Sequence, residues 1–171
     1  MHNNLALAGL KELFYHYHYS INAMDVQSTI IKLIRYTAKG LPGEALQSVR
    51  LLEGLGMEGD FHAQGGERQL SLLCLEQRQW MDEQAEPGLC FKRYKENILL
   101  DGLPPAILVP GIRLKAGEAL LEISDAGKHC FEECPLFSTG RHCVLANRKL
   151  FAKVARGGLV KTGDAVEEEK P

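Results

Sequence analysis

Residues 150–167 read LFAKVARGGLVKTGDAVE, a run of short apolar stretches interrupted by tight turns. Two of these stretches, 150–154 and 159–161, are separated by a glycine pair, and a Gly-Asp turn precedes a third at 165–167. Apolar runs of this length, bounded by turn residues, are typical of β-strands with short connections. The C-terminal third therefore predicts a β-sheet.

The same pattern continues toward the N-terminus. Further strands are predicted at 29–36, 46–53, 69–75, 97–100, 112–114 and 119–124. One short helix is predicted at 76–84, where Trp80 and Met81 lie among polar residues before a Pro-Gly break. Many short strands with few helices indicate a mostly β fold, either a closed barrel or a sandwich.

Length and composition indicate one globular domain. The chain has 171 residues, of which 45% are hydrophobic and 25% charged. We expect this domain over 28–168, with an N-terminal extension at 1–27 and a tail at 169–171. The formal net charge of −2 gives no electrostatic case for nucleic acid or an anionic membrane as a partner. No apolar run is long enough to cross a bilayer, and the N-terminus does not resemble a secretory signal, so we expect a cytoplasmic protein with reduced thiols.

The extension at 1–27 differs from the rest of the chain, because aromatic residues alternate with His16 and His18. The simplest interpretation is an accessory helix or a loose tail, with Met24 as a possible start. Contact with a metal or an aromatic ligand is the alternative.

A glycine-rich loop, GLGMEGD at residues 54–60, is the first candidate binding element. Glycine lets the backbone approach a ligand closely, and backbone N–H groups near an arginine such as Arg68 favour phosphate. The loop is neither a Walker loop nor a dinucleotide fingerprint, because no Gly-Lys-Ser/Thr and no strand–helix alternation accompany it. The alternatives are a structural loop, a surface role for Arg68, and a turn-stabilising role for the pair Glu96-Asn97.

The five cysteines are an odd number, so at least one thiol is expected to be free. Cys74 and Cys90 lie in apolar stretches and are predicted to be buried. Cys130 follows Gly-Lys-His and precedes a predicted helical turn at 131–137. A lysine, a histidine and helix N-terminal amides all favour the thiolate, the form that sulfur transfer or molybdenum ligation requires.

Two alternatives for this cysteine-rich region stay open. A zinc site would use residues drawn from Cys130, Cys134, Cys143, His129 and His142, although the C-x3-C spacing is not that of a tight zinc knuckle. Cys130 and Cys134 could instead form a redox pair.

Taken in chain order, these elements resemble the MOSC family, named for the C-terminal domain of molybdenum-cofactor sulfurases. The resemblance covers about 30–166. Its motifs are GMEGDFH at 56–62, RQLSLL at 68–73, ENI at 96–98, LKAGEALLEI at 114–123 and GKHC at 127–130. Many members have Arg-x-Pro-Cys at the last position, whereas this chain looks like the shorter bacterial branch with Gly-Lys-x-Cys.

The resemblance implies a closed MOSC-type β-barrel with a few short helices, which binds a pterin-based molybdenum cofactor, molybdopterin. Cys130 would be the catalytic residue, as molybdenum ligand or persulfide carrier. The implied cofactor-binding residues are Gly59, Asp60, His62, Arg68, Gln69, Ser71, Asn97 and Lys128.

Three functions follow from the resemblance. The first is a carrier that delivers the cofactor or its sulfur to a molybdoenzyme. We expect it to lack the pyridoxal-phosphate domain that mobilises sulfur from cysteine. The second is a small reductase of N-hydroxylated compounds that works with electron-transfer proteins. The third is a non-catalytic domain with a decayed site.

Overall fold

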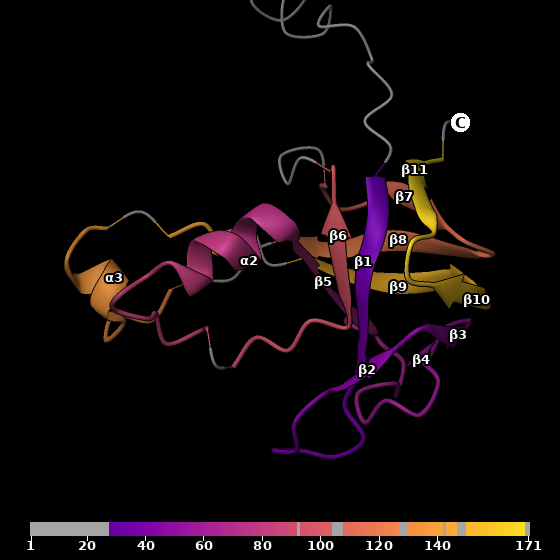
Figure 1. Cartoon of the computed structure of the whole chain (residues 1–171), viewed down its shortest axis with the longest axis horizontal. Helices are drawn as coiled ribbons and strands as arrows, with labels where there is room; N and C mark the ends of the chain where they lie inside the picture. The colour runs from indigo at the N-terminus through magenta and orange to yellow at the C-terminus, as the bar shows by residue number, and fades with distance from the viewer. Residues whose placement is uncertain are drawn as a thin grey trace, which may run out of the picture.

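The computed structural model describes residues 28–91, 93–103, 108–126, 130–141, 143–146 and 150–169. Its strands and helices are β1 (Ser28–Arg35), β2 (Glu44–Leu46), β3 (Ser48–Leu52), β4 (Gly56–Met57), β5 (Leu70–Cys74), α2 (Leu75–Asp82), β6 (Ile98–Asp101), β7 (Arg113–Ala116), β8 (Ala119–Ala126), α3 (Pro135–Ser138), β9 (Leu150–Arg156), β10 (Gly158–Lys161) and β11 (Ala165–Glu168). The strands gather at one end of the molecule, α3 lies at the other, and α2 lies between them (Figure 1). Within these ranges, neither helix has the length and hydropathy needed to cross a membrane.

Seven strands close into a barrel, in the order β11-β7-β8-β9-β5-β6-β1. The first and last strands complete the ring, because Ser28 pairs with Val166 and Thr29 with Ala165. β2 adds an eighth strand alongside β1, and a separate three-stranded sheet has the order β10-β3-β4. The prediction of a mostly β, closed barrel with few helices is therefore confirmed for the described part of the chain.

Alternation of side chains along the strands builds the core. In β9, Leu150, Ala152 and Val154 are buried while the residues between them are only half-buried. Successive side chains of a strand point to opposite faces, so the strand presents one apolar row to the barrel interior. The same alternation is interrupted in β1, where a bulge between Ile30 and Lys32 leaves Lys32 exposed.

The strands β5 and β6 run parallel to each other, whereas the other barrel neighbours are antiparallel. Two parallel neighbours cannot be joined by a hairpin, so the chain must cross from one end of the barrel to the other between them. The crossing contains α2 and the segment 83–97. This crossover therefore lies outside the barrel and forms a wall beside β1 and β6.

Two sequence predictions need correction. The strand predicted at 46–53 is divided at Gln47, because β2 pairs with β1 of the barrel while β3 pairs with β10 of the small sheet. The helical turn predicted at 131–137 begins only at Pro135, whose fixed φ suits the first helical position. Cys134, not Cys130, therefore precedes that helix. The extension at 1–27 lies outside the described residues.

Candidate functional site

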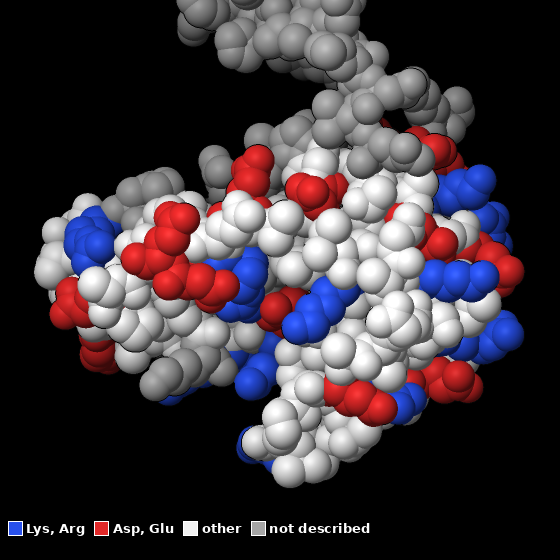
Figure 2. Space-filling model, in the orientation of Figure 1, with Lys and Arg blue, Asp and Glu red and all other residues white. Residues whose placement is uncertain are grey.

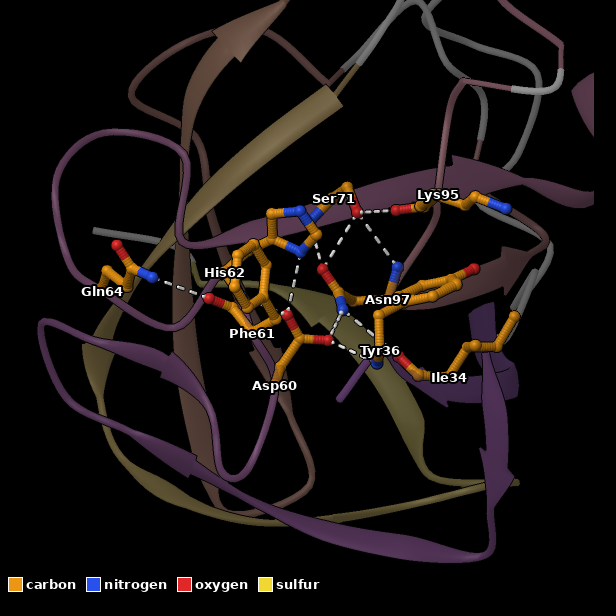
Figure 3. A network of polar contacts seen from close by, with 9 residues as sticks. All are labelled: Ile34, Tyr36, Asp60, Phe61, His62, Gln64, Ser71, Lys95 and Asn97. Carbon is orange, nitrogen blue, oxygen red and sulfur yellow. Dashed lines mark hydrogen bonds and ion pairs between the residues drawn. The ribbon is translucent and has the colours of Figure 1, made fainter. Parts of the chain in front are cut away.

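A buried carboxylate lies at the centre of the candidate site. Asp60 follows β4, and its side chain is only 2% exposed. Its Oδ2 accepts hydrogen bonds from the backbone N–H of Tyr36 at 2.8 Å and from Asn97 Nδ2 at 2.9 Å. Its Oδ1 accepts the backbone N–H of His62 at 2.8 Å and lies 3.1 Å from His62 Nδ1 (Figure 3). These donors offset the cost of burying the charge, which is large for an unpaired carboxylate.

Asn97 extends this network to a third part of the chain. Its Oδ1 accepts the backbone N–H of Ser71 at 3.1 Å and lies 3.0 Å from Ser71 Oγ, while Nδ2 also donates to the carbonyl of Ile34 at 3.2 Å. Ser71 Oγ donates to the carbonyl of Lys95 as well. The glycine loop, the strand β5 and the Glu-Asn-Ile element are therefore joined through side-chain hydrogen bonds at one point (Figure 3).

His62 is the solvent-facing member of the network. Its side chain is 54% exposed, in contrast to the buried Asp60. An ionised carboxylate can only accept hydrogen bonds, so the contact with Asp60 places the proton of a neutral imidazole on Nδ1. The Nε2 atom then carries a lone pair and is available to a partner outside the protein. The buried carboxylate therefore holds His62 in one tautomer.

Gly59 occupies a position that requires glycine. Its φ is +75°, and a Cβ there would lie 3.2 Å from Nη1 of Arg35. Three amides at this loop are, however, already engaged: Glu58 donates its backbone N–H to the carbonyl of Arg50, Asp60 donates to Met57, and Phe61, the next residue, donates to Tyr36. These amides are not available to cradle an anion, so a cofactor contact at Gly59 stays a prediction.

Arg68 and Gln69 make their observed contacts within the protein. Arg68 donates through Nε (3.0 Å) and Nη2 (2.5 Å) to Oδ2 of Asp125, and its guanidinium lies 4.8 Å from the ring centroid of Phe151. A phosphate would have to compete with Asp125 for this arginine. Gln69 is 5% exposed and joins the carbonyl of Gly66 to the backbone N–H of Val154, which holds the segment before β5 against β9.

The cysteines occupy different environments. Cys130 is half-buried in the segment that follows β8, and its neighbour Phe131 lies 5.7 Å from the guanidinium of Arg93. Cys74 is buried as predicted, and burial, assisted by the charge of Glu76, raises the pKa of its thiol to about 12. Cys90 is half-buried rather than buried. Cys74 is therefore unsuited to thiolate chemistry, and Cys130 stays the predicted reactive thiol.

Several predicted ligands cannot be placed. Lys128, His129 and His142 lie outside the described residues. Within the ranges that the structure describes, His, Cys, Asp and Glu do not form a group of three or more suited to a metal ion.

The sequence did not identify every residue of the network. Tyr36 contributes its backbone N–H, and Ile34 and Lys95 contribute carbonyl oxygens. Every residue except proline has these backbone groups, so residue type gives no signal for such a role.

The protein is a closed seven-stranded barrel with a short crossover helix, which is the type of fold expected from the MOSC resemblance. No protein-family profile and no curated protein sequence matches the chain. Solved structures do match. The YuaD protein from Bacillus subtilis is 19% identical with a TM-score of 0.59, over 82% of this chain and 94% of YuaD.

Two further structures agree with this result. YiiM from Geobacillus stearothermophilus is 16% identical with a TM-score of 0.58, over 84% of this chain and 75% of YiiM. YiiM from Escherichia coli is 20% identical with a TM-score of 0.51, over 85% of this chain and 69% of YiiM. YuaD and YiiM are MOSC-domain proteins, so these similarities support a MOSC fold for this chain. At such identities they establish the fold alone.

Proposed function

We propose that this protein binds a molybdopterin-type molybdenum cofactor and carries the cofactor, or its sulfur, through Cys130. The observation that carries the proposal is the network around Asp60. Three of the motifs on which the MOSC resemblance rests, far apart in sequence, meet there through the side chains of Asp60, Ser71 and Asn97. A fold similar to two MOSC-domain proteins supports the same interpretation.

The chemistry of the available groups fits such a cofactor. Asp60 and Asn97 are buried and hydrogen-bonded, so they form a rigid base from which His62 presents Nε2 to a heterocycle. Arg68 is 56% exposed and offers a planar guanidinium suited to phosphate, if phosphate replaces Asp125. A cysteine thiolate is a soft ligand suited to molybdenum. When bound, the cofactor would supply a metal centre that exchanges sulfur or electrons.

The experiment is to purify the full chain from a host that makes molybdenum cofactor and to measure bound molybdenum and pterin. We expect both in the wild type and a clear loss of molybdenum in Cys130→Ser. Cys90→Ser is the matched control, because it makes the same change at another half-buried thiol and should retain the wild-type content. Absence of both metal and pterin, while a known molybdenum protein from the same host retains them, would refute binding and favour a decayed site.

The second candidate is a reductase of N-hydroxylated compounds, supported by the Asp60–His62 pair. Reduction of R–NH–OH to R–NH2 and water consumes two electrons and two protons. The exposed Nε2 of an imidazole held by a buried carboxylate can take up a proton from water and pass it to the substrate. The electrons would come from an electron-transfer protein, so the assay needs such a donor. Turnover that is lost in His62→Gln, with cofactor content unchanged, would favour the reductase over the carrier.

A further inference from the structure

A hollow lies between the crossover and the barrel. It has a volume of about 740 Å³ and is formed by β1, α2, the segment 91–96 and β6. Its lining residues are Lys32, Tyr36, Arg78, Asp82, Phe91, Tyr94, Lys95, Glu96 and Leu99. We call it the crossover pocket. None of these residues belongs to the set assigned to molybdopterin, and the volume suits a small-molecule ligand.

One wall of the crossover pocket is aromatic. Tyr36, Phe91 and Tyr94 contribute rings, and Leu99 adds an aliphatic surface. Tyr94 is held by hydrogen-bond contacts of its hydroxyl with the backbone carbonyls of Leu72 and Leu150, so its ring is fixed. The wall is therefore suited to a flat apolar group.

The charged side chains of the pocket differ in whether they form ion pairs. Its two carboxylates both contact Arg78: Glu96 Oε2 lies 2.8 Å from Nη2 and Asp82 Oδ1 lies 3.5 Å from Nη1. Within the described residues, Lys32 and Lys95 have no carboxylate partner, and the ammonium of Lys95 lies 5.7 Å from the ring centroid of Tyr36. Lys32 and Lys95 are therefore the cations outside these ion pairs, and the three cationic and two acidic side chains give the pocket a formal net charge of +1. Figure 2 shows acidic and basic side chains side by side on this face of the molecule.

The backbone directs these groups into the pocket. The bulge between Ile30 and Lys32 interrupts the alternation of β1 and turns Lys32 outward, and bulges are a common means of re-aiming a side chain. In Figure 3, the hydroxyl of Tyr36 and the ammonium of Lys95 both point away from His62. Burial and the nearby charge of Glu96 raise the pKa of Tyr36 to about 12, so its hydroxyl keeps its proton and can donate a hydrogen bond.

The geometry points to the crossover pocket as a binding site for an aromatic anion, a flat ring that bears a carboxylate or a phosphate. The ring would lie against Tyr36 and Phe91, and the anionic group would contact Lys32 and Lys95. The site goes beyond the proposed function, because it shares no residue with the cofactor-binding set. If the crossover pocket does not bind aromatic anions, the proposal of molybdopterin binding is unaffected. If the protein does not bind molybdopterin, the inference about the crossover pocket is likewise unaffected.

Four compounds test the chemistry: 2-naphthoate, 2-naphthyl phosphate, neutral 2-naphthamide and cyclohexanecarboxylate. Binding to the full chain is followed by NMR through the indole N–H of Trp80, the only tryptophan, whose ring packs edge-to-face against Phe91 at 5.8 Å. A ligand of this size is expected to bind with a Kd of about 1 mM. The amide and the non-aromatic acid should bind at least about fivefold more weakly, since each lacks one of the two contacts.

Variants then locate the site. Lys32→Gln and Lys95→Gln should each weaken naphthoate binding about fivefold, which is the effect of one contact-distance charge in a water-like medium. Lys161→Gln, an exposed lysine on β10 of the small sheet, should leave binding unchanged. Binding of the phosphate but not the carboxylate would assign the site to phosphorylated aromatics, and binding of both would assign it to aromatic anions in general. Equal binding of the amide, unchanged affinity in both lysine variants, or no saturable shift of the Trp80 signal would overturn the inference.

Discussion

Replacing Asp60 by Asn tests whether the carboxylate organises the candidate site. Each Asp60 oxygen faces two nitrogen atoms, and three of these four contacts are made by N–H donors that cannot act as acceptors. An asparagine has one oxygen and one NH2 group. If the oxygen faces Tyr36 and Asn97, the NH2 group meets the backbone N–H of His62, and one donor loses its acceptor.

The cost can be worked from these contacts. One unsatisfied buried donor costs about 1–3 kcal/mol, and two hydrogen bonds to a charged acceptor become weaker neutral ones. We therefore expect Asp60→Asn to lower the free energy of unfolding by about 3 kcal/mol, out of a total of about 5–15 kcal/mol for a domain. His62 should also move its proton from Nδ1 to Nε2, because Nδ1 must now accept from the new NH2 group.

Urea denaturation followed by circular dichroism measures the first effect, and the 15N chemical shifts of the imidazole measure the second. Asp82→Asn is the control, since Asp82 is 67% exposed and its ion pair with Arg78, of the i,i+4 type, is worth about 0.5 kcal/mol or less. A loss below about 1 kcal/mol in Asp60→Asn, together with an unchanged tautomer of His62, would refute the central role of this carboxylate.

Three further predictions concern stability. Tyr94→Phe removes a buried hydroxyl that contacts two backbone carbonyls and should cost about 1–2 kcal/mol in urea denaturation, whereas Tyr36→Phe should stay within about 0.5 kcal/mol; equal losses would contradict the assignment of these hydroxyls. Gly56→Ala should cost at least about 2 kcal/mol, because φ is +131° and the added Cβ would lie 2.6 Å from the carbonyl oxygen of Gln69; a wild-type melting temperature would show that the turn can relax. Burial raises the pKa of the Cys74 thiol from 9.0 to about 12, so the unfolded chain releases this proton at a lower pH than the folded chain does. The free energy of unfolding should therefore fall by up to about 1.4 kcal/mol per pH unit between pH 9 and about 12. Cys74→Ala should flatten that slope, and the same slope in both proteins would exclude this thiol as its source.

Local sequence was sufficient to predict strands where two strands and the turn between them are adjacent in the chain. The strands β7 and β8 were predicted from two apolar runs on either side of a glycine, because alternation and turn chemistry are both local properties. The division at Gln47 was missed for the opposite reason. Nothing in that residue marks a break, which exists only because β2 and β3 pair with strands from distant parts of the chain.

The same distinction applies to the site. Asp60, His62, Ser71 and Asn97 were assigned together from motifs of the resemblance, and the structure joins them in one network. The pairing of Arg68 with Asp125 could not be predicted, because it depends on how β5 and β8 flank β9. Long-range packing decides which partner a charged side chain meets, and no local pattern in a single sequence identifies that partner.

Closure of the barrel through β1 and β11 also constrains how the protein folds during synthesis. Among the described barrel strands, the first one synthesised pairs with the last one, since Ser28 pairs with Val166. Until then one flank of β1 presents unpaired N–H and C=O groups at this end, which is the kind of strand edge that invites association with other chains. Completion of the ring therefore waits until β11 has been synthesised, and a nascent chain that stalls before β11 should depend on chaperones far more than a chain that contains it.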